Sequence, residues 1–362
     1  MPQPTRRLSF PPRTEFFKVL QKRINDYFDQ NQVKQTGNSW LYFKAFFAFS
    51  LYIGGYIGLV FFAQTWLSGI LFALMLTNGM ILVAFNVMHD GAHGSFSSKK
   101  WVNWLAGASM DLLGSSQTLW QQKHNMLHHT YTNITGKDDD IELGLLMRFS
   151  PHQTWHPWHR FQHIYAPFLY SLLTLFLAVF SDFYKLVTNR ISDTPLQKRK
   201  WWELPYFTFT KIAYIGYALI LPMFFHPISL VLLYFFCIHF FFGFILSLVF
   251  QLAHTVDLTE FPKENEQNKM CYDWAEHQLR TTANFAIENP LVRFYTGGLN
   301  QQVEHHLFHK VSHIHYYSLS KIVQETCLEY DMPYHKNNSL TSAVLSHFRF
   351  LKQMGRKPTL TN

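Results

Sequence analysis

Two long stretches of the chain contain no charged side chain. No Asp, Glu, Lys or Arg occurs in residues 45–89 or in residues 212–256, and each stretch is 45 residues long. Because one membrane crossing requires about 20 apolar residues, each stretch can hold two helices and a tight turn. The pattern therefore predicts an all-α integral membrane protein in which four transmembrane helices form two hairpins. We place these helices at residues 45–63, 67–88, 204–225 and 228–251.

Polar residues mark the turns of the two hairpins. The first turn falls near Gln64 and Thr65, and the second falls at His226 and Pro227. A water-soluble protein is the alternative class, but two uncharged stretches of this length would be very unusual in one. We therefore interpret the chain as membrane-spanning.

Two further segments are apolar enough to touch a membrane. Residues 161–181 carry no charge and are flanked by segments that we expect on the same side. A single crossing there would separate the histidine clusters described below, so we expect an interfacial or re-entrant helix. Residues 101–119 are apolar apart from Asp111, and we expect a helix that lies at the interface.

The distribution of Lys and Arg predicts which side of the membrane faces the cytoplasm. The first 44 residues contain eight of these side chains, whereas the two predicted turns contain none. The positive-inside rule therefore places both ends of each hairpin, and both chain termini, in the cytoplasm. No cleaved signal peptide is predicted near the start. We divide the chain into a cytoplasmic arm (1–40), a membrane domain (41–330) and a cytoplasmic tail (331–362).

Composition narrows the class further. Only 15% of the residues are charged and 18% are aromatic, which excludes a disordered or collagen-like chain. The net charge of +8 is explained by topology and by contact with membrane lipid, so no nucleic-acid partner is predicted. Cys237, Cys271 and Cys327 form no C-x-x-C pair and are too few for a disulfide scaffold. The unusual feature is the presence of 20 histidines.

The histidines cluster beside the ends of the predicted transmembrane helices. Residues 89–93 read His-Asp-Gly-Ala-His and follow the second helix, and His254 stands at the end of the fourth. Two imidazoles four residues apart lie on one helix face, where they can share a metal ion. One such pair alone would be weak support, since paired surface histidines also occur by chance.

Two further clusters strengthen this interpretation. Residues 124–129 read His-Asn-Met-Leu-His-His, and residues 302–306 read Gln-Val-Glu-His-His. His124 and His128 share a helix face, and His129 is placed to reach a second metal ion close to the first. His309, His313 and His315 follow the last cluster, and we expect them beside the site rather than among its ligands.

Eight imidazoles in three clusters and at one helix end are too many for one metal ion. Shared between two ions, they leave coordination positions for a substrate or oxygen. Imidazole suits Fe, Zn, Cu and Ni about equally, so spacing alone does not name the metal. The residues predict a dinuclear, nitrogen-rich site beside an apolar interior, for which a lipid chain is the natural substrate. The candidate ligands are His89, His93, His124, His128, His129, His254, His305 and His306.

The three clusters resemble the three histidine boxes of the membrane fatty acid desaturases. Their order, their spacing and the paired hydrophobic hairpins are also similar, from about Trp40 to Tyr330. The third box begins with Gln302 instead of His, which resembles the front-end desaturases and the linoleoyl-CoA desaturase group. The words His-His-Thr-Tyr-Thr-Asn (128–133) and Asn-Gln-Gln-Val-Glu-His-His-Leu-Phe-His (300–309) are similar to that group as well.

The resemblance implies an enzyme with two iron ions that uses O₂ and two electrons to introduce a cis double bond into a fatty acyl chain. The box histidines would take the ligand roles, and His254 occupies the place of the additional ligand of the acyl-CoA desaturases. Gln302 is a neutral and poorer ligand, so it would bind weakly, bind through water or only shape the site. The water-holding Asn of the acyl-CoA enzymes is replaced by Phe250, and we do not transfer its role.

Acidic residues near the boxes are candidates for orienting the imidazoles by accepting their second N–H. Their alternative role is to keep the cytoplasmic face soluble. The candidates are Asp90, Asp138, Asp140 and Glu304, with Asp139 and Glu142 as further members. Phe- and Tyr-rich helices would shape a narrow apolar slot for an acyl chain carried by CoA or by a lipid.

One departure from the family and three rival functions complete the interpretation. The chain lacks the His-Pro-Gly-Gly motif of a fused cytochrome domain, so electrons would come from a separate ferredoxin or cytochrome with its reductase. A membrane di-iron hydroxylase or mono-oxygenase is the nearest rival enzyme. A histidine-rich metal transporter is the non-enzymatic rival, although transporters bind at mid-membrane. A zinc peptidase is disfavoured, because the sequence contains no H-E-x-x-H.

Overall fold

Helices dominate the computed structural model, which describes residues 8–358. The α-helices are α1 (Glu15–Asn31), α2 (Ser39–Ile57), α3 (Trp66–Val83), α4 (His89–His93), α5 (Lys100–Leu112), α6 (Gln117–Gln121), α7 (His129–Tyr131), α8 (Gln162–Ser171), α9 (Leu173–Phe176), α10 (Asp182–Thr188), α11 (Glu203–Ile215), α12 (Leu221–Met223), α13 (Ile228–His254), α14 (Trp274–Thr281), α15 (Pro290–Tyr295), α16 (Gln302–Leu307), α17 (Tyr316–Glu329) and α18 (Leu340–Met354). Wider π-helical turns lie at Gly58–Phe62, Ala84–Met88, Gln122–His128, Leu177–Ser181 and Gly216–Ile220. Short 3₁₀ turns lie at Asp139–Ile141, Pro157–Phe161 and His313–His315.

The strands are only two residues long and form two small ladders. β1 (Arg190–Ile191) pairs antiparallel with β2 (Thr194–Pro195), and β3 (Asn284–Phe285) pairs parallel with β4 (Lys336–Asn337). The second ladder joins the segment before the third histidine cluster to the segment before α18. It therefore fixes the C-terminal part of the chain beside that cluster.

Within residues 8–358, four helices are long and apolar enough to cross a membrane, as the two uncharged stretches predict. They run over Ser39–Phe62, Trp66–His93, Glu203–Met223 and Ile228–His254. Helices end and begin on either side of Gln64 and of His226, where the two turns are predicted. The second helix extends beyond its predicted end at residue 88 and carries His89 and His93 on its last turns.

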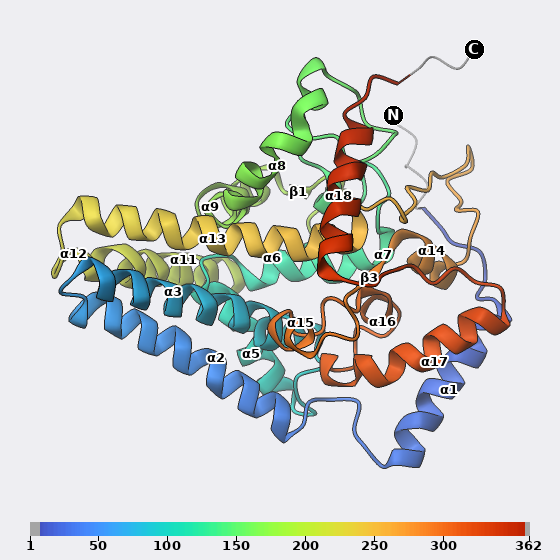
Figure 1. Ribbon diagram of the computed structural model, residues 1–362, viewed down its shortest axis with the longest axis horizontal. Helices are drawn as coiled ribbons and strands as arrows, with labels where there is room; N and C mark the ends of the chain where they lie inside the picture. Colours follow the sequence, from blue (N-terminus) through green and yellow to red (C-terminus); the bar gives the residue numbers. More distant parts are fainter. Residues whose placement is uncertain (1–7, 359–362) are drawn as a thin grey trace.

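The long helices lie side by side and build the main core (Figure 1). α13 packs against α3, α8 and α9, and α2 packs along α3. Glycines permit the close approach of α2 to α3, because a Cβ on Gly79 would come within 2.5 Å of the Tyr52 Cα. Small residues at such contacts let helix backbones approach in a membrane.

One end of this bundle is covered by α1, α14, α16, α17 and α18 (Figure 1). α1 packs against α17, burying Phe16, Leu20 and Ile24 in a second core with Val323. The predicted arm thus contributes a packed helix over Glu15–Asn31, and the predicted tail contributes α18, which packs against α8 and α13. Residues 1–7 and 359–362, at the ends of those two predicted segments, lie outside the described residues.

The uncharged segment 161–181 forms a bent pair of helices. Pro157–Ser171 and Leu173–Thr188 meet at an angle of 55° around Leu172. A bend of this kind occurs in a broken span and in a re-entrant segment alike, so the interfacial or re-entrant position stays a prediction. α5 occupies most of residues 101–119, where a helix is expected.

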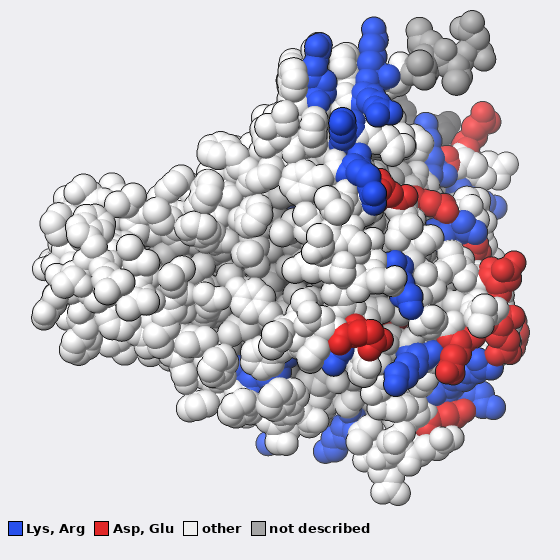
Figure 2. Space-filling view, viewed as in Figure 1, with Lys and Arg blue, Asp and Glu red and all other residues white. Residues whose placement is uncertain are grey.

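Charged side chains concentrate at the end of the molecule where the shorter helices gather. On the face shown in Figure 2, Lys, Arg, Asp and Glu cover that end, and the far end near α12 is free of them. Exposed apolar side chains such as Phe46, Leu67 and Ile212 lie along the long helices. This surface, apolar along the bundle and charged at one end, is that of a protein embedded in a membrane.

Gly79→Leu tests the close contact between α2 and α3. The added side chain meets the backbone of Tyr52 and separates the helices, so we expect a loss of about 1–3 kcal/mol in the free energy of unfolding. Thermal unfolding of the detergent-solubilised protein measures this loss. Gly216→Leu is the matched control, because a Cβ on Gly216 meets nothing within 4 Å. Equal midpoints for the two variants would contradict the prediction.

Candidate metal centre

The first histidine pair stands on the last turn of the second long helix. The π-helical turn Ala84–Met88 leads directly into α4, which ends at Gly94 with a φ of 76°. Gly91, between His89 and His93, lies against α5, and a Cβ there would be 2.6 Å from the Ala106 Cβ. The glycine therefore allows α5 to cover one side of the helix while both imidazoles point to the other.

Four imidazoles from three distant segments converge into a first group, which consists of His89, His93, His124 and His305. Each offers one nitrogen, and the four nitrogens lie within 4.8 Å of one another. The ring centroids of His89 and His305 are 4.5 Å apart, although 216 positions separate the two residues. All four side chains are buried.

A second group, beside the first, consists of His128, His254 and His306. Their ligand nitrogens also lie within 4.8 Å of one another. The ring centroid of His254 is 4.7 Å from that of His128 and 4.8 Å from that of His306. His254, at the end of α13, thus joins a cluster that sequence spacing alone does not connect to it.

His129 lies between the two groups. Its Nε2 is 3.3 Å from Nε2 of His124 in the first group, and its ring centroid is 4.4 Å from that of His306 in the second. The seven histidines of the two groups and His129 are the eight candidate ligands, so the structure brings all of them together.

His124 and His128 keep the shared helix face that the sequence predicts, since their rings stack with centroids 5.1 Å apart. His124 takes part in the first group and His128 in the second, and the two also form a third set with Asp140 whose ligand atoms lie within 4.8 Å of one another. Residues 122–128 form a π-helical turn, which is wider than an α-helical one.

The imidazole nitrogens fit metal binding by their chemistry. Buried nitrogens normally have a hydrogen-bond partner, yet within residues 8–358 none exists for Nε2 of His89, His128, His254, His305 or His306, nor for either nitrogen of His93. Burial, followed by the charges of neighbouring histidines, lowers the pKa of His124, His129, His305 and His306 well below its usual range. Neutral rings with free lone pairs are what a metal ion requires.

Carboxylates orient the rings of the second cluster. His128 Nδ1 lies 3.1 Å from both carboxylate oxygens of Asp138 and 3.3 Å from Asp140 Oδ2. Burial alone would lower the pKa of His128, but Asp138 and Asp140 outweigh it and raise that pKa. With Nδ1–H directed at a carboxylate, the tautomer of His128 leaves Nε2 free for a metal.

Lys123 balances these acids. Its Nζ lies 2.7 Å from Asp140 and 3.4 Å from Asp139. Burial raises the pKa of Asp140, but the Lys123 ammonium and the neighbouring histidines together outweigh this and hold that pKa below its usual range. Asp139 also contacts Lys185 and Ser192, so it joins the ion-pair network rather than an imidazole.

Two predicted orienting residues, Asp90 and Glu304, play different parts. Asp90 accepts a hydrogen bond from Ser312 Oγ at 2.7 Å and lies 3.0 Å from His313 Nδ1, not beside a candidate ligand. Glu304 accepts hydrogen bonds from Tyr334 and Asn284. Neighbouring residues on a helix point in different directions, so a carboxylate next to a ligand in the sequence does not face the ligand imidazole. Burial raises the pKa of Glu304 to about 7.

Three further groups contact the imidazoles of candidate ligands, and the sequence does not predict them. His305 Nδ1 lies 3.0 Å from the Tyr316 hydroxyl, and His306 Nδ1 lies 2.8 Å from Gln278 Oε1. His254 Nδ1 lies 3.3 Å from the carbonyl oxygen of Thr281. No motif marks Tyr316 or Gln278, so only the tertiary structure reveals them.

Gln302 and His309 lie at the margin of the site. The Gln302 side chain is buried beside His254, and its Nε2 has no partner among the described residues. A rotation of the Gln302 amide by about 180° would place Oε1 where Nε2 now lies. His309 lies outside both groups, with its ring centroid 5.1 Å from that of His129.

An apolar cavity of about 380 Å³ opens onto the first group. His89 and His124 line one end together with Lys123, Asp139 and Asp140, and the remainder lies between α13 and the bent pair α8–α9. Along α13 the lining runs from Phe242 to Gln251, which is about 13 Å at 1.5 Å per residue. We call this space the metal-side cavity.

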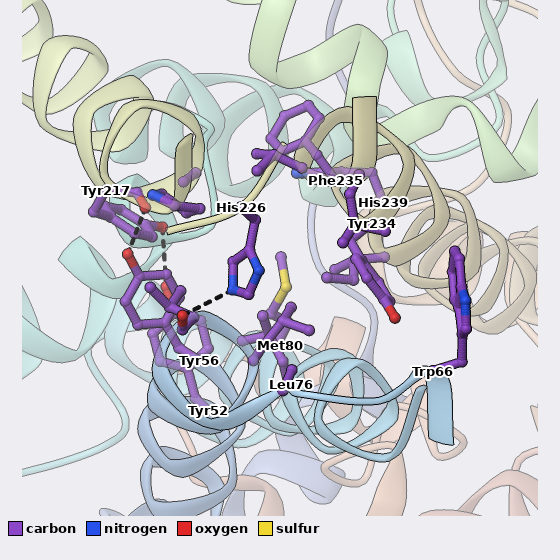
Figure 3. Close-up of a pocket in the computed structure, with 18 of the residues that line it drawn as sticks. Tyr52, Tyr56, Trp66, Leu76, Met80, Tyr217, His226, Tyr234, Phe235 and His239 are labelled. Atoms are coloured by element: carbon purple, nitrogen blue, oxygen red, sulfur yellow. Dashed lines mark hydrogen bonds between the residues drawn. The ribbon is translucent and has the colours of Figure 1, made fainter. Parts of the chain in front are cut away.

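A second cavity of about 300 Å³ lies deeper in the helix bundle. Figure 3 shows Tyr52, Tyr56 and Tyr217 on one side of it and Tyr234, Phe235 and His239 on the other. It shares no lining residue with the metal-side cavity. We call it the deep cavity.

One layer of side chains separates the two cavities. Tyr214, which lines the deep cavity, donates a hydrogen bond to His239 Nε2. Nδ1 of His239 lies 3.1 Å from Oγ1 of Thr174, which lines the metal-side cavity. Phe242, which lies about one helical turn after His239 on α13, lines the metal-side cavity. The hydrogen-bonded wall therefore limits the length of a molecule in that cavity.

Comparison with known proteins agrees with this geometry. The fatty acid desaturase family matches residues 64–338. The sn-1 linoleoyl-lipid 6-desaturase of Arthrospira platensis is 30% identical over 99% of this chain and 97% of its own length. The enzyme of the same name from Synechocystis sp. is 32% identical over 97% of this chain and 98% of its own. The acyl-lipid (8-3)-desaturase of Physcomitrium patens is 32% identical over 94% of this chain and 72% of its own.

The chain belongs to the fatty acid desaturase family. It is an integral membrane oxidoreductase that acts on fatty acyl chains, with a histidine-rich metal site and a need for an electron donor. Family membership decides against the metal transporter, and the position of the histidines at one end of the long helices agrees with this.

Asp138→Asn tests the orientation of His128. The amide cannot hold the imidazole tautomer as a carboxylate does, so we expect metal affinity to fall about 10–100-fold. Metal content of the purified protein after dialysis against a graded series of chelator concentrations measures this fall. Asp139→Asn is the matched control, because Asp139 contacts Lys123 and Lys185 but no imidazole. Equal metal retention by the two variants would show that Asp138 does not act through His128.

Proposed function

We propose that the enzyme is an O₂-dependent front-end desaturase that places a cis double bond close to the carboxyl end of an unsaturated fatty acyl chain. The observation that carries this proposal is the metal-side cavity, an apolar channel whose charged end coincides with the buried histidines. A chain that enters with its carboxyl end at Lys123 presents its first methylenes to His89 and His124. The methyl end then extends along α13 away from the site.

In this proposal the two groups of imidazoles hold two iron ions. His89, His93, His124 and His305 would hold one ion, His128, His254 and His306 would hold the other, and His129, which lies beside both groups, would be a further ligand. The second group has one imidazole fewer than the first, and Gln302 would complete it by binding the ion directly or through water. When bound, the irons supply the reduction of O₂ to two molecules of water, using two electrons, two protons and two hydrogens from the substrate.

The surrounding residues position the chain and exclude water. Phe85, Leu246 and Phe250 line the cavity beside the histidines, so the methylenes lie in a narrow apolar environment. Asp138 and Asp140 hold His128, and Tyr316 and Gln278 hold His305 and His306. Rigid support of this kind keeps neighbouring methylenes at a defined distance from the metals.

The substrate is an acyl group carried by a lipid or by CoA. The names of the relatives from Arthrospira platensis and Synechocystis sp. refer to linoleoyl lipid, which supports a lipid-borne chain, and the apolar lining of the cavity suits the methylenes of such a chain. The lining extends about 13 Å along α13, which is close to half of the ~30 Å hydrocarbon core of a bilayer.

We further propose that the metal site and both chain termini face the cytoplasm. The basis is the positive-inside rule, because Lys and Arg concentrate near the metal site and not in the two distal turns. Electrons then come from a separate cytoplasmic carrier, a ferredoxin or a cytochrome with its reductase. Turnover with a purified ferredoxin system, compared with a cytochrome system, distinguishes the two donors.

Expression in cells fed defined unsaturated fatty acids tests the reaction. We expect products that are two hydrogens lighter than the substrate, with the new double bond on the carboxyl side of the existing ones. His128→Ala should abolish the product while membrane insertion is retained, and His156→Ala is the control, because His156 stacks on Trp158 away from the site. A product heavier by one oxygen would instead establish the hydroxylase alternative.

Tyr214→Ala tests the wall between the two cavities. Removing the ring joins the metal-side cavity to the deep cavity, so longer acyl chains fit. We expect the ratio of C22 to C18 product to rise about tenfold, since each methylene that ceases to clash changes discrimination by that order. Mass spectrometry of the products measures the ratio.

Tyr214→Phe is the matched control, because it removes the hydrogen bond to His239 but keeps the ring in the wall. We expect it to retain the chain-length preference of the unmodified enzyme. An unchanged ratio in an active Tyr214→Ala enzyme would exclude the wall as the limit on chain length.

A further inference from the structure

A third cavity, of about 250 Å³, lies between the start of α2, α15 and α17. It shares no lining residue with the metal-side cavity or the deep cavity. Its walls include Trp40, Lys44, Arg293, Phe294, Gln301 and Tyr317. We call it the basic cavity, because two of these side chains are cationic.

Lys44 is a buried cation with few partners. Its side chain lies in the first turns of α2 and is only 4% exposed. Its Nζ donates one hydrogen bond, to His313 Nε2 at 2.8 Å, and Asp90 lies only beyond that ring. An ammonium group has three N–H donors. A buried charge is costly unless it is paired, so the remaining donors favour an anion in the cavity.

Arg293 supplies the second cation. Its guanidinium stacks on the Tyr317 ring at 4.0 Å and donates one hydrogen bond to the carbonyl oxygen of Ile287. The stacking fixes the plane of the group and leaves further N–H donors available. Within residues 8–358, neither Arg293 nor Lys44 forms an ion pair with a carboxylate.

Gln301 provides a third donor that is independent of charge. The side chain is 1% exposed and lines the basic cavity, and its Nε2 has no partner among the described residues. Lys44, Arg293 and Gln301 thus line one cavity, and each has N–H donors beyond those that find a hydrogen-bond partner within residues 8–358. A phosphate has several acceptor oxygens and a negative charge, so it satisfies all three.

The surroundings of the basic cavity identify the source of the phosphate. Trp40 at the rim is half exposed, and Phe43 and Phe46, which follow it on α2, are exposed too. Aromatic side chains at the start of a membrane-spanning helix lie at the level of the lipid headgroups. Basic pockets between helices at this level bind anionic headgroups.

We propose that the basic cavity binds the phosphate of an anionic phospholipid on the membrane face that holds the metal site. The bound phosphate accepts hydrogen bonds from Lys44, Arg293 and Gln301, and the acyl chains lie along Phe43 and Phe46. Gln301 precedes Gln302, and Lys44 reaches Asp90 through His313. The lipid therefore stabilises the two segments that carry the first and the third histidine clusters.

The test uses the full-length protein in nanodiscs of phosphatidylcholine with increasing phosphatidylglycerol. Native mass spectrometry of the released protein counts the bound phosphatidylglycerol, and thermal unfolding measures stabilisation. We expect saturable binding and a rising midpoint, because a ligand that binds only the folded state stabilises it. A separate arm adds inorganic phosphate at the same concentration to protein in detergent.

Substitutions in the lining of the basic cavity test whether phosphatidylglycerol binds there. Lys44→Gln and Arg293→Gln should each lower the retained phosphatidylglycerol about fivefold, and Lys44→Arg should restore most of it. Lys100→Gln is the matched control, because Lys100 is an exposed cation near Trp101 at the same membrane level and lines no cavity described above. Arg293→Gln alone decides the result should Lys44→Gln fail to fold.

Two outcomes would overturn the proposal. The basic cavity is not the lipid site if Arg293→Gln retains phosphatidylglycerol as the unmodified protein does. Equal stabilisation by inorganic phosphate and by phosphatidylglycerol would identify a free-anion site instead of a lipid site. Saturable binding that both cavity variants weaken, without a matching effect of inorganic phosphate, supports the proposal.

Discussion

The structure depends on burying neutral imidazoles, several of which have a nitrogen without a hydrogen-bond partner among residues 8–358. Such nitrogens are costly in an apolar interior, and here they come from the end of α4, the π-helical turn at Gln122–His128, the end of α13, and α16. No single segment can hold them together. The packing of the long helices and the hydrogen bonds from Asp138, Gln278 and Tyr316 must therefore supply the free energy that keeps the rings in place until a metal is bound.

This constraint explains why the polar residues of the protein are arranged as they are. Carboxylates lie where an Nδ1–H needs an acceptor, as Asp138 does beside His128, and a lysine lies where the carboxylates need a counter-charge, as Lys123 does beside Asp140. On the other side of the first group, the acyl channel is apolar. The boundary between the charged network and the channel runs through His89 and His124, so the chemistry occurs where polar and apolar surroundings meet.

Much of the fold and the set of site histidines could be predicted from the sequence, because both follow from local periodicity. Uncharged stretches of 45 residues indicate helix pairs, and histidines four residues apart indicate shared faces. The π-helical turn that carries His124 and His128 could not be predicted, since no compositional feature marks it. Gln278 and Tyr316 were missed because their role arises only from tertiary contact. Asp90 and Glu304 were misassigned because nearness in sequence does not direct a side chain.

The π-helical turns have a consequence for how this protein tolerates change along its chain. Each residue added to or removed from a helix rotates everything beyond it by about 100°. The turn at Ala84–Met88 precedes His89 and His93, and the turn at Gln122–His128 contains His124. A deletion in either turn would swing imidazoles out of their group, whereas a deletion in the surface loop between β2 and α11 would rotate none of them. The length of these two turns is therefore constrained in addition to the identity of the histidines that they carry or precede.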